Sequence, residues 1–226
     1  MQPIWTIGHS TRKIDTFISL LEENGIKLLV DVRTLPGSKR YPQFNKEMLA
    51  KSLQEHGIHY EHFAELGGRR KPRPGSRNIA WRNASFRGYA DYMETEEFGK
   101  GVKRLVDLAN ESGPTVIMCA EAVWWRCHRS LISDYLKVRG IEVIHIIDAK
   151  KTEPHPFYPC GVHRWWHAKL RERQRSVNLA RLTHRIAPAP LTVISDLRRS
   201  ENDTGGHRDR VDEVCKSRDV HFNVDR

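Results

Sequence analysis

The chain has 226 residues, of which 38% are hydrophobic and 29% charged, a length that allows one sizeable α/β domain with an extension or two small domains. Apolar runs such as IKLLVDV need burial and exclude wholesale disorder, while none approaches the roughly 20 residues of a membrane-spanning helix. The 38 Lys and Arg against 28 Asp and Glu give a formal net charge of +10, which favours polyanions or phosphorylated small molecules as partners.

The N-terminal segment and the cysteine content indicate the compartment. The chain opens on MQPIWTIGHS, which lacks the cationic and apolar regions of a secretory signal, and its four cysteines are too few for a disulfide scaffold. We therefore expect a cytoplasmic protein with reduced thiols and no membrane partner. The sequence leaves the oligomeric state open.

Short apolar runs alternate with amphipathic stretches along the first 148 residues, a pattern typical of βαβ units. Five strands are expected, over residues 4–8, 27–32, 59–63, 114–120 and 141–147. Helices are expected from residue 14 to the Asn24-Gly25 stop and over residues 45–56, 98–109 and 127–138. In the second helix, Asn45 is the expected cap and Met48 is expected to face inward. The predicted fold is an α/β fold with a mostly parallel, doubly wound sheet of about five strands and helices on both faces.

The composition changes after this alternating region. We expect the α/β domain to comprise residues 1–150, and a basic extension containing Pro and Trp to comprise residues 151–226. The extension is weakly patterned, so we expect it to be irregular and in part disordered. Within the domain, residues 66–76 (LGGRRKPRPGS) form a basic loop of a length typical of functional loops.

The segment CAEAVWWRCHRS, residues 119–130, directly follows an expected strand and precedes an expected helix. Ligands of open α/β sheets bind beyond the carboxyl ends of strands, and a helix N-terminus favours anions. A thiol surrounded by positive groups at such a place has a lowered pKa. Cys119, or its rival Cys127, is therefore a candidate nucleophile, with His128 as acid and base. In this interpretation Glu121 orients these groups and Arg129 binds the anion.

Two other expected strands end in comparable groups. His9 and Ser10 follow the first strand, whereas Asp31 and Arg33 lie at the end of the second. If these strands are parallel neighbours of the strand that ends at Cys119, their polar side chains converge on one rim. We then expect His9 and Asp31 to take part in catalysis and Ser10 and Arg33 to bind substrate. The alternatives are a helix cap at Ser10 or Thr11 and a structural Asp31–Arg33 pair.

Several ordered pieces of the sequence carry a resemblance to a known family. They are TIGHS (residues 6–10), DVR (31–33), Pro36 with Ser38, Phe44, LGG (66–68), FRGYADYM (86–93), CAE (119–121), CHR (127–129) and HPF (155–157). In these pieces the chain resembles the DUF488 family, a set of proteins named for unknown function, over approximately residues 4–157. The resemblance implies a domain with a cysteine-bearing catalytic or ligand-binding site. The family's reaction is not implied. We interpret the chain as a thiol-dependent hydrolase or transferase that acts on an anionic substrate.

Nucleic-acid binding without catalysis is an alternative. Here the basic loop grips phosphate through Arg69, Arg70, Lys71, Arg73 and Arg77, and bases stack on Trp81, Phe86 and Tyr89. The two functions are compatible, because an enzyme that processes nucleic acid needs both features.

A zinc-binding domain is a second alternative. Its ligands would come from Cys119, Cys127, His128, Cys160 and either His155 or His163. Because Cys119 and Cys127 lack the short spacing of a compact structural site, we expect no metal. No G-x-G-x-x-G or Walker A pattern is present either, so we expect no cofactor.

Overall fold

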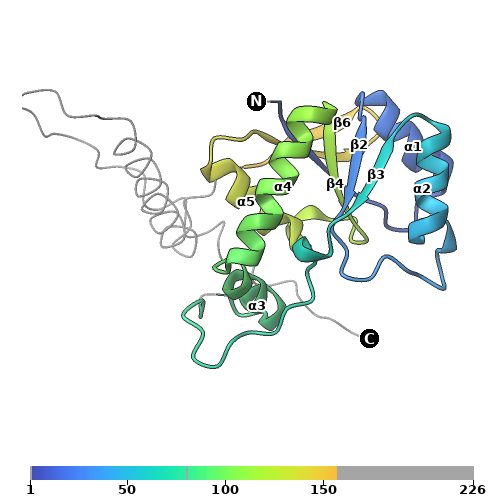
Figure 1. The fold of residues 1–226 in the computed structure, drawn as a ribbon. Helices are drawn as coiled ribbons and strands as arrows, with labels where there is room; N and C mark the ends of the chain where they lie inside the picture. Colours follow the sequence, from blue (N-terminus) through green and yellow to red (C-terminus); the bar gives the residue numbers. More distant parts are fainter. Residues whose placement is uncertain (1, 80, 157–226) are drawn as a thin grey trace, which may run out of the picture. The chain divides into compact units, whose positions relative to one another are not determined.

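A computed structural model describes residues 2–79 and 81–156, which are organised around a six-stranded sheet of order β3-β2-β4-β1-β5-β6 (Figure 1). The parallel strands are β1 (Ile4–Gly8), β2 (Leu28–Asp31), β3 (His59–His62), β4 (Thr115–Cys119) and β5 (Val143–Asp148). The sixth strand, β6 (Lys151–Pro154), pairs antiparallel with β5. The predicted α/β fold is thus confirmed, with one additional edge strand.

The edge strand β6 carries the sequence KTEP, whose polar residues and proline give no apolar alternation. Such residues are tolerated at a sheet edge, which explains why the sequence did not predict a strand here. These four residues had been assigned to the basic extension. Residues 157–226 of that extension lie outside the described residues.

Four helices lie where they were predicted. These are α1 (Ile14–Glu23), α2 (Lys46–Glu55), α4 (Glu96–Ser112) and α5 (Arg129–Val138). Short 3-10 turns occur at Pro42–Phe44, Ala64–Leu66 and Trp124–Arg126. In Figure 1, α1 and α2 lie on one side of the sheet and α4 and α5 on the other, as expected for a doubly wound sheet.

One helix was not predicted, and two details of α2 were wrong. Helix α3 (Ala84–Tyr92) has no clean apolar stripe, but the side chain of Asn83 caps it by accepting hydrogen bonds from two backbone amides. Asn45 precedes α2 without capping it, because its Oδ1 accepts from the amide of Ser38 at 2.6 Å. Met48 is 55% exposed, since the buried face of α2 is formed by Leu49 and Leu53.

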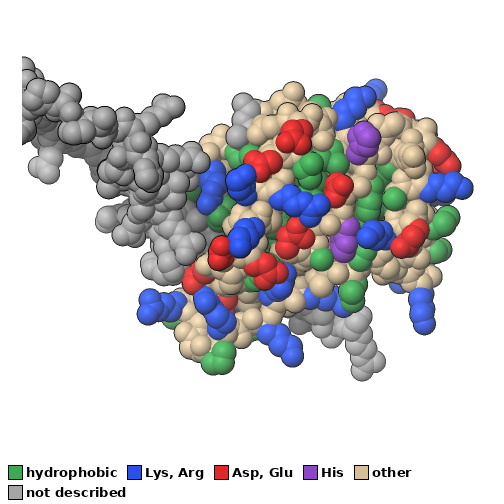
Figure 2. All heavy atoms as spheres, in the orientation of Figure 1, with side chains coloured by type: hydrophobic (Ala, Val, Ile, Leu, Met, Phe, Trp, Pro, Cys, Tyr) green, Lys and Arg blue, Asp and Glu red, His purple; other side chains and the backbone are tan. Residues whose placement is uncertain are grey.

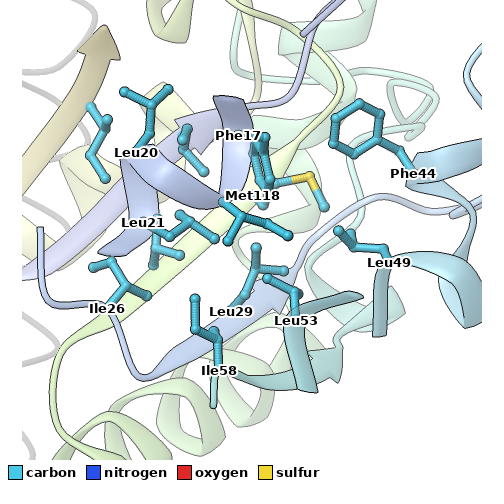
Figure 3. Close-up of a cluster of buried hydrophobic side chains, with 14 residues drawn as sticks. Phe17, Leu20, Leu21, Ile26, Leu29, Phe44, Leu49, Leu53, Ile58 and Met118 are labelled. Carbon is cyan, nitrogen blue, oxygen red and sulfur yellow. The ribbon is translucent and has the colours of Figure 1, made fainter. Parts of the chain in front are cut away.

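A cluster of buried apolar side chains joins α1 and α2 to the sheet (Figure 3). Phe17 and Leu21 of α1 and Leu53 of α2 pack there with Leu29 of β2 and Met118 of β4. Close packing of this kind allows little relative movement of the elements. The core therefore fixes where β2 and β4 end.

The chain topology creates a crevice at the carboxyl ends of the central strands. The connection after β1 leads through α1 towards β2, and the connection after β4 leads through α5 towards β5, in opposite directions along the sheet. Because crossovers are right-handed, the two helices lie on opposite faces. Neighbouring strands with this property flank the crevice in which α/β proteins bind ligands.

None of the helices within residues 2–79 and 81–156 is long and apolar enough to cross a membrane.

The end of β1 makes a close backbone contact that only glycine permits. A Cβ atom at Gly8 would lie 1.9 Å from the carbonyl oxygen of Glu121, in the loop after β4. We predict that Gly8→Ala lowers the free energy of unfolding by about 1–3 kcal/mol or more, the usual cost of overpacking. The control is Gly99→Ala in α4, where a Cβ would meet nothing within 4 Å and where alanine favours the helix. Chemical denaturation of both variants checks this, and a Gly8→Ala protein as stable as wild type would contradict it.

Candidate active site

A pocket of about 710 Å³ opens at the carboxyl ends of β1, β2 and β4. The strands end level with one another, since Gly8 is in register with Cys119 and Asp31 with Met118. The amide of His9 donates to the carbonyl of Cys119 at 3.0 Å, which ties the two loops together just beyond the strands. The pocket wall includes nine of the candidate residues predicted from the sequence: His9, Ser10, Arg33, Arg69, Phe86, Cys119, Glu121, Cys127 and His128.

Two sulfur atoms approach one imidazole nitrogen at this pocket. Nδ1 of His128 lies 3.5 Å from the Sγ of Cys127 and 4.0 Å from the Sγ of Cys119. The other ring nitrogen, Nε2, lies 3.1 Å from the carbonyl oxygen of Val32. Because a carbonyl only accepts hydrogen bonds, Nε2 carries a proton, and Nδ1 is the ring nitrogen that faces both sulfurs.

The orientation of His128 is fixed by the elements packed around it. The ring of Tyr89 lies 5.1 Å from the imidazole between centroids, and the Tyr89 hydroxyl donates to the carbonyl of Leu66 at 2.8 Å. A Cβ atom at Gly68 would lie 2.4 Å from Nδ1 of His128, so the loop can pass over the imidazole only with glycine at this position. Tyr89 is fully buried beneath the site, not on the pocket wall, and supports His128 and the loop.

Arg129 also lies behind the pocket wall, with only 1% of its surface exposed. Its Nε donates to the sulfur of Cys127 at 3.4 Å. Its Nη2 donates to the carbonyl of Glu121, and its Nη1 donates to the hydroxyl of Thr6 at 3.3 Å. Each guanidinium nitrogen is thus directed at a protein atom. This places the Arg129 charge beside a sulfur atom and away from the space available to a substrate.

The surroundings of the two thiols differ in their effect on ionisation. Burial opposes ionisation of Cys127, but a hydrogen bond from Cys119 and the positive charges of His128 and Arg129 outweigh it and hold the pKa of Cys127 well below its usual value. The hydrogen bond to Cys127, together with burial, raises the pKa of Cys119 well above its usual value. Of the two thiols, Cys127 is therefore the one that ionises first.

Asp31 and Arg33 form a buried ion pair at the end of β2. Nη2 of Arg33 lies 2.6 Å from the carboxylate of Asp31, which also accepts a hydrogen bond from the hydroxyl of Tyr60 at 2.8 Å. The same Nη2 donates to the carbonyl of Phe44. Asp31 is completely buried below the pocket, whereas Arg33 reaches its wall. The structural pair considered from the sequence is present, and it presents Arg33 to the pocket.

Comparison with known families gives a match to a family defined without a known function. The profile described as "Domain of unknown function DUF488" matches residues 13–136. The chain belongs to the DUF488 family. No curated protein and no solved structure gives a significant match. The matched region of this DUF488 protein contains both cysteines, His128 and Arg129, but it begins after His9.

Glu121 and Ser10 form hydrogen bonds with nearby backbone groups of the loop after β4. The exposed carboxylate of Glu121 borders the pocket and accepts a hydrogen bond from the amide of Val123 at 3.4 Å. Ser10 has a φ of 50°, and its amide donates to the carbonyl of Ala120 at 2.9 Å. It is not a helix cap, because α1 begins at Ile14 and Lys13 occupies the cap position.

The basic loop of the DUF488 protein contributes Arg69 to the pocket wall, whereas Arg70 and Arg73 interact with other side chains of the protein. Arg69 is exposed on the pocket wall. The guanidinium of Arg70 instead lies 3.6 Å from the centroid of the Tyr92 ring, and Arg73 forms an ion pair with Glu94 at 2.6 Å. On the face in Figure 2, basic side chains are interspersed with acidic ones.

Of the aromatic residues expected to stack on bases, Trp81 and Phe86 stack on each other, with ring centroids 5.4 Å apart, and Tyr89 is buried. Nucleic-acid binding stays a prediction.

The cysteine–histidine cluster also has the composition of a metal site. One ligand atom from each of Cys119, Cys127 and His128 lies within 4.8 Å of the others, so these atoms can reach a single cation. His155, a fourth ligand considered from the sequence, is directed elsewhere, because its ring nitrogens bond to His145 and Asp134. Cys160 and His163 lie outside the described residues.

Some features of the site were missed by the sequence analysis. The pocket wall also includes Thr34 and Tyr41. Both lie in loops outside the motifs, so no sequence signal identified them. Behind the site, His145 lies in strand β5 between Ile144 and Ile146. A histidine in a buried strand needs hydrogen-bond partners, and this signal was available but unused.

His9 was predicted to take part in catalysis, but its surroundings keep its imidazole neutral near pH 7. Burial, and then the charge of Arg33, lower the pKa of His9 from 6.5 to about 4. Its Nδ1 lies 2.9 Å from the carbonyl of Ser10, and its Nε2 lies 3.3 Å from Nη1 of Arg33. Because the carbonyl only accepts and the guanidinium only donates, Nδ1 carries the proton and Nε2 accepts. His9 is therefore a neutral acceptor that holds Arg33 in place.

This pKa shift predicts how the stability of the protein depends on pH. Between pH 6.5 and about 4 the unfolded chain binds a proton at His9 that the folded chain does not, so stability is lost as the pH falls through this window. We predict that His9→Asn, whose amide can still donate to Ser10, loses less stability over the same window than wild type. Thermal unfolding at a series of pH values measures this difference. Parallel pH profiles for the two proteins would show that His9 is not the group responsible.

Proposed function

We propose that this DUF488 protein is a thiol-dependent enzyme, a hydrolase or transferase, that acts on an anionic substrate with Cys127 as the nucleophile. The observation that carries the proposal is the position of the Cys127 sulfur, 3.5 Å from Nδ1 of His128 and 3.4 Å from Nε of Arg129. A thiolate between an acceptor for its proton and a fixed positive charge is an activated nucleophile. Cys127 borders the pocket, so a substrate bound there is within its reach.

The proposed chemistry follows from the orientation of His128. Nδ1 of His128 takes the proton of the Cys127 thiol, and the resulting imidazolium is stabilised through its Nε2–H bond to the carbonyl of Val32. The sulfur of Cys127 forms a bond to the electrophilic atom of the substrate. The bond to the leaving group breaks, and the leaving group departs with the electron pair and takes the proton from Nδ1. In the second step, Nδ1 of His128 takes a proton from water or a second substrate, whose oxygen or other nucleophilic atom bonds to the transferred group. The bond from this group to the Cys127 sulfur breaks, and the thiolate is released.

Cys119 acts differently in this scheme. Its thiol lies at the end of β4, partly exposed, and donates a hydrogen bond towards the Cys127 sulfur. A thiol with a raised pKa is a poor nucleophile but a good hydrogen-bond donor to a neighbouring thiolate. The sequence favoured Cys119 as the nucleophile. The surroundings favour Cys127.

An anionic substrate is supported by the charges on the pocket wall. Arg33, Arg69 and Arg126 all border the pocket, together with the hydroxyl-bearing residues Ser10 and Ser38. Guanidinium and hydroxyl groups are the common donors to phosphate and sulfate oxygens. A volume of about 710 Å³ lies within the usual range for small-molecule sites, which suits a phosphorylated or sulfated compound up to the size of a nucleotide.

Alkylation with iodoacetamide tests the nucleophile residue by residue, with peptide mass spectrometry to locate the label. We predict that at pH 6 Cys127 reacts about tenfold faster than a reference peptide thiol of pKa about 8.5, because it is already ionised. Between pH 8 and pH 6 its rate should change little, whereas that of the reference thiol should fall roughly a hundredfold. The Cys119→Ser and Cys127→Ser proteins serve as controls for the assignment.

A second arm of the same experiment tests the anion. Inorganic phosphate or sulfate should slow alkylation of Cys127, and Arg69→Gln should weaken this protection. Arg77→Gln is the matched control, because Arg77 is exposed on the same loop but does not border the pocket. Cysteines that react no faster than the reference thiol would overturn the proposed nucleophile, and so would stoichiometric zinc bound by the purified protein through these sulfurs.

A further inference from the structure

A chain of buried polar side chains runs from Arg129 away from the pocket, and the proposed chemistry does not use it. Nη1 of Arg129 lies 3.3 Å from Oγ1 of Thr6, which in turn lies 2.7 Å from Nδ1 of His145. Nε2 of His145 lies 2.9 Å from Nδ1 of His155, and Nε2 of His155 lies 2.9 Å from the carboxylate of Asp134. The chain links four separate elements: β1, β5, the segment after β6, and α5.

With both imidazoles neutral, the hydrogen bonds of this chain can run in only one direction. Arg129 at one end only donates, and the Asp134 carboxylate at the other end only accepts. A hydroxyl and two neutral imidazoles between them each have one hydrogen to donate along the chain and one atom to accept. Thr6 therefore donates to His145, His145 donates to His155, and His155 donates to Asp134. Both imidazoles carry their proton on Nε2.

The burial of these polar groups indicates that they do more than fill space in the core. Thr6 and His145 are 0% exposed, and His155 is 1% exposed. Trp124 covers the ring of His145 in a stacked arrangement, with centroids 4.1 Å apart and planes 6° apart. Burying polar groups is costly unless each is paired, and apolar side chains would fill the same space without that cost. A fully paired polar chain in a core fixes the orientation of its members.

We propose that Thr6, His145, His155 and Asp134 are positioning residues that hold the Arg129 guanidinium with its Nε–H directed at the Cys127 sulfur. The inference rests on the proposed thiol chemistry only in treating Cys127 as the reactive group. Thr6 anchors one end nitrogen of the guanidinium, and the carbonyl of Glu121 anchors the other. With both end nitrogens anchored, the planar guanidinium has one orientation, in which Nε–H faces the Cys127 sulfur.

The hydroxyl of Thr6 is the link that can be removed with least change in shape. We expect Thr6→Val to slow alkylation of Cys127 at pH 6 by about tenfold and to move the pH midpoint of that reaction up by about one unit, the equivalent shift in pKa. Thr6→Ser restores the hydroxyl and should recover most of the rate. Thr115→Val is the matched control, because Thr115 is a buried strand threonine whose hydroxyl bonds to the carbonyl of Gly113, outside the chain.

A second substitution and a spectroscopic measurement guard against a folding artefact. Asp134→Asn removes the terminal charge at a half-buried helix position and should slow alkylation several-fold. Nitrogen-15 NMR of the imidazoles in the full chain reports tautomers directly, and we expect His145 and His155 both to be neutral and protonated on Nε2.

The outcomes separate this inference from the proposed function. If Cys127 is reactive and Thr6→Val and Asp134→Asn leave its rate and pH midpoint unchanged, the positioning role is wrong and the proposed function stands. If wild-type Cys127 reacts no faster than the reference thiol, the proposed function is wrong. The positioning role is then decided by the midpoint shift of Thr6→Val and by the tautomers. A proton on Nδ1 of His145 or His155 would contradict the proposed direction of the hydrogen bonds and with it the positioning role.

Discussion

The contact between the guanidinium of Arg129 and the sulfur of Cys127 is the interaction on which the rest of the site depends. A buried positive charge is costly unless a negative partner and hydrogen-bond acceptors surround it. In this protein the acceptors are a carbonyl in the loop after β4, the hydroxyl of Thr6 and the Cys127 sulfur itself, 3.4 Å from Nε. In the proposed function, a thiolate at Cys127 supplies the missing negative charge. The same pairing that makes the buried arginine tolerable therefore also favours ionisation of the thiol.

The fold brings this contact about by ending three parallel strands at one level and placing a helix start next to them. One short stretch of chain, from Cys119 at the end of β4 to Arg129 at the start of α5, carries both cysteines, His128 and Arg129, so it determines their local order. Its placement is not local: Gly8 lets the end of β1 approach that segment, and Gly68 lets the basic loop pass over His128. Small backbone contacts thus decide whether the imidazole reaches the sulfurs.

The sequence predicted the fold class and the meeting of the three strand ends, because both depend on hydrophobic alternation and on the rule that ligands bind beyond parallel strands. It did not predict that Arg129 lies behind the pocket wall, or that His9 is a neutral partner of Arg33. Those roles depend on hydrogen bonds between residues far apart in the chain, such as Thr6 with His145. Helix α3 and strand β6 were missed for a different reason. Both have weak apolar patterns: α3 is capped by the side chain of Asn83, and β6 pairs with β5.

The central claim is that Cys119 and Cys127 share one negative charge at neutral pH and that the charge resides on Cys127. Carbon-13 NMR of the full chain with labelled cysteine Cβ atoms, assigned with single Cys→Ser variants and followed across a pH titration, measures this directly. The account predicts that the Cys127 resonance titrates well below the usual thiol pKa of about 8.5 and the Cys119 resonance well above it. Two resonances that both titrate near the usual value would contradict the account, because neither the histidine nor the buried arginine would then be acting on the sulfur.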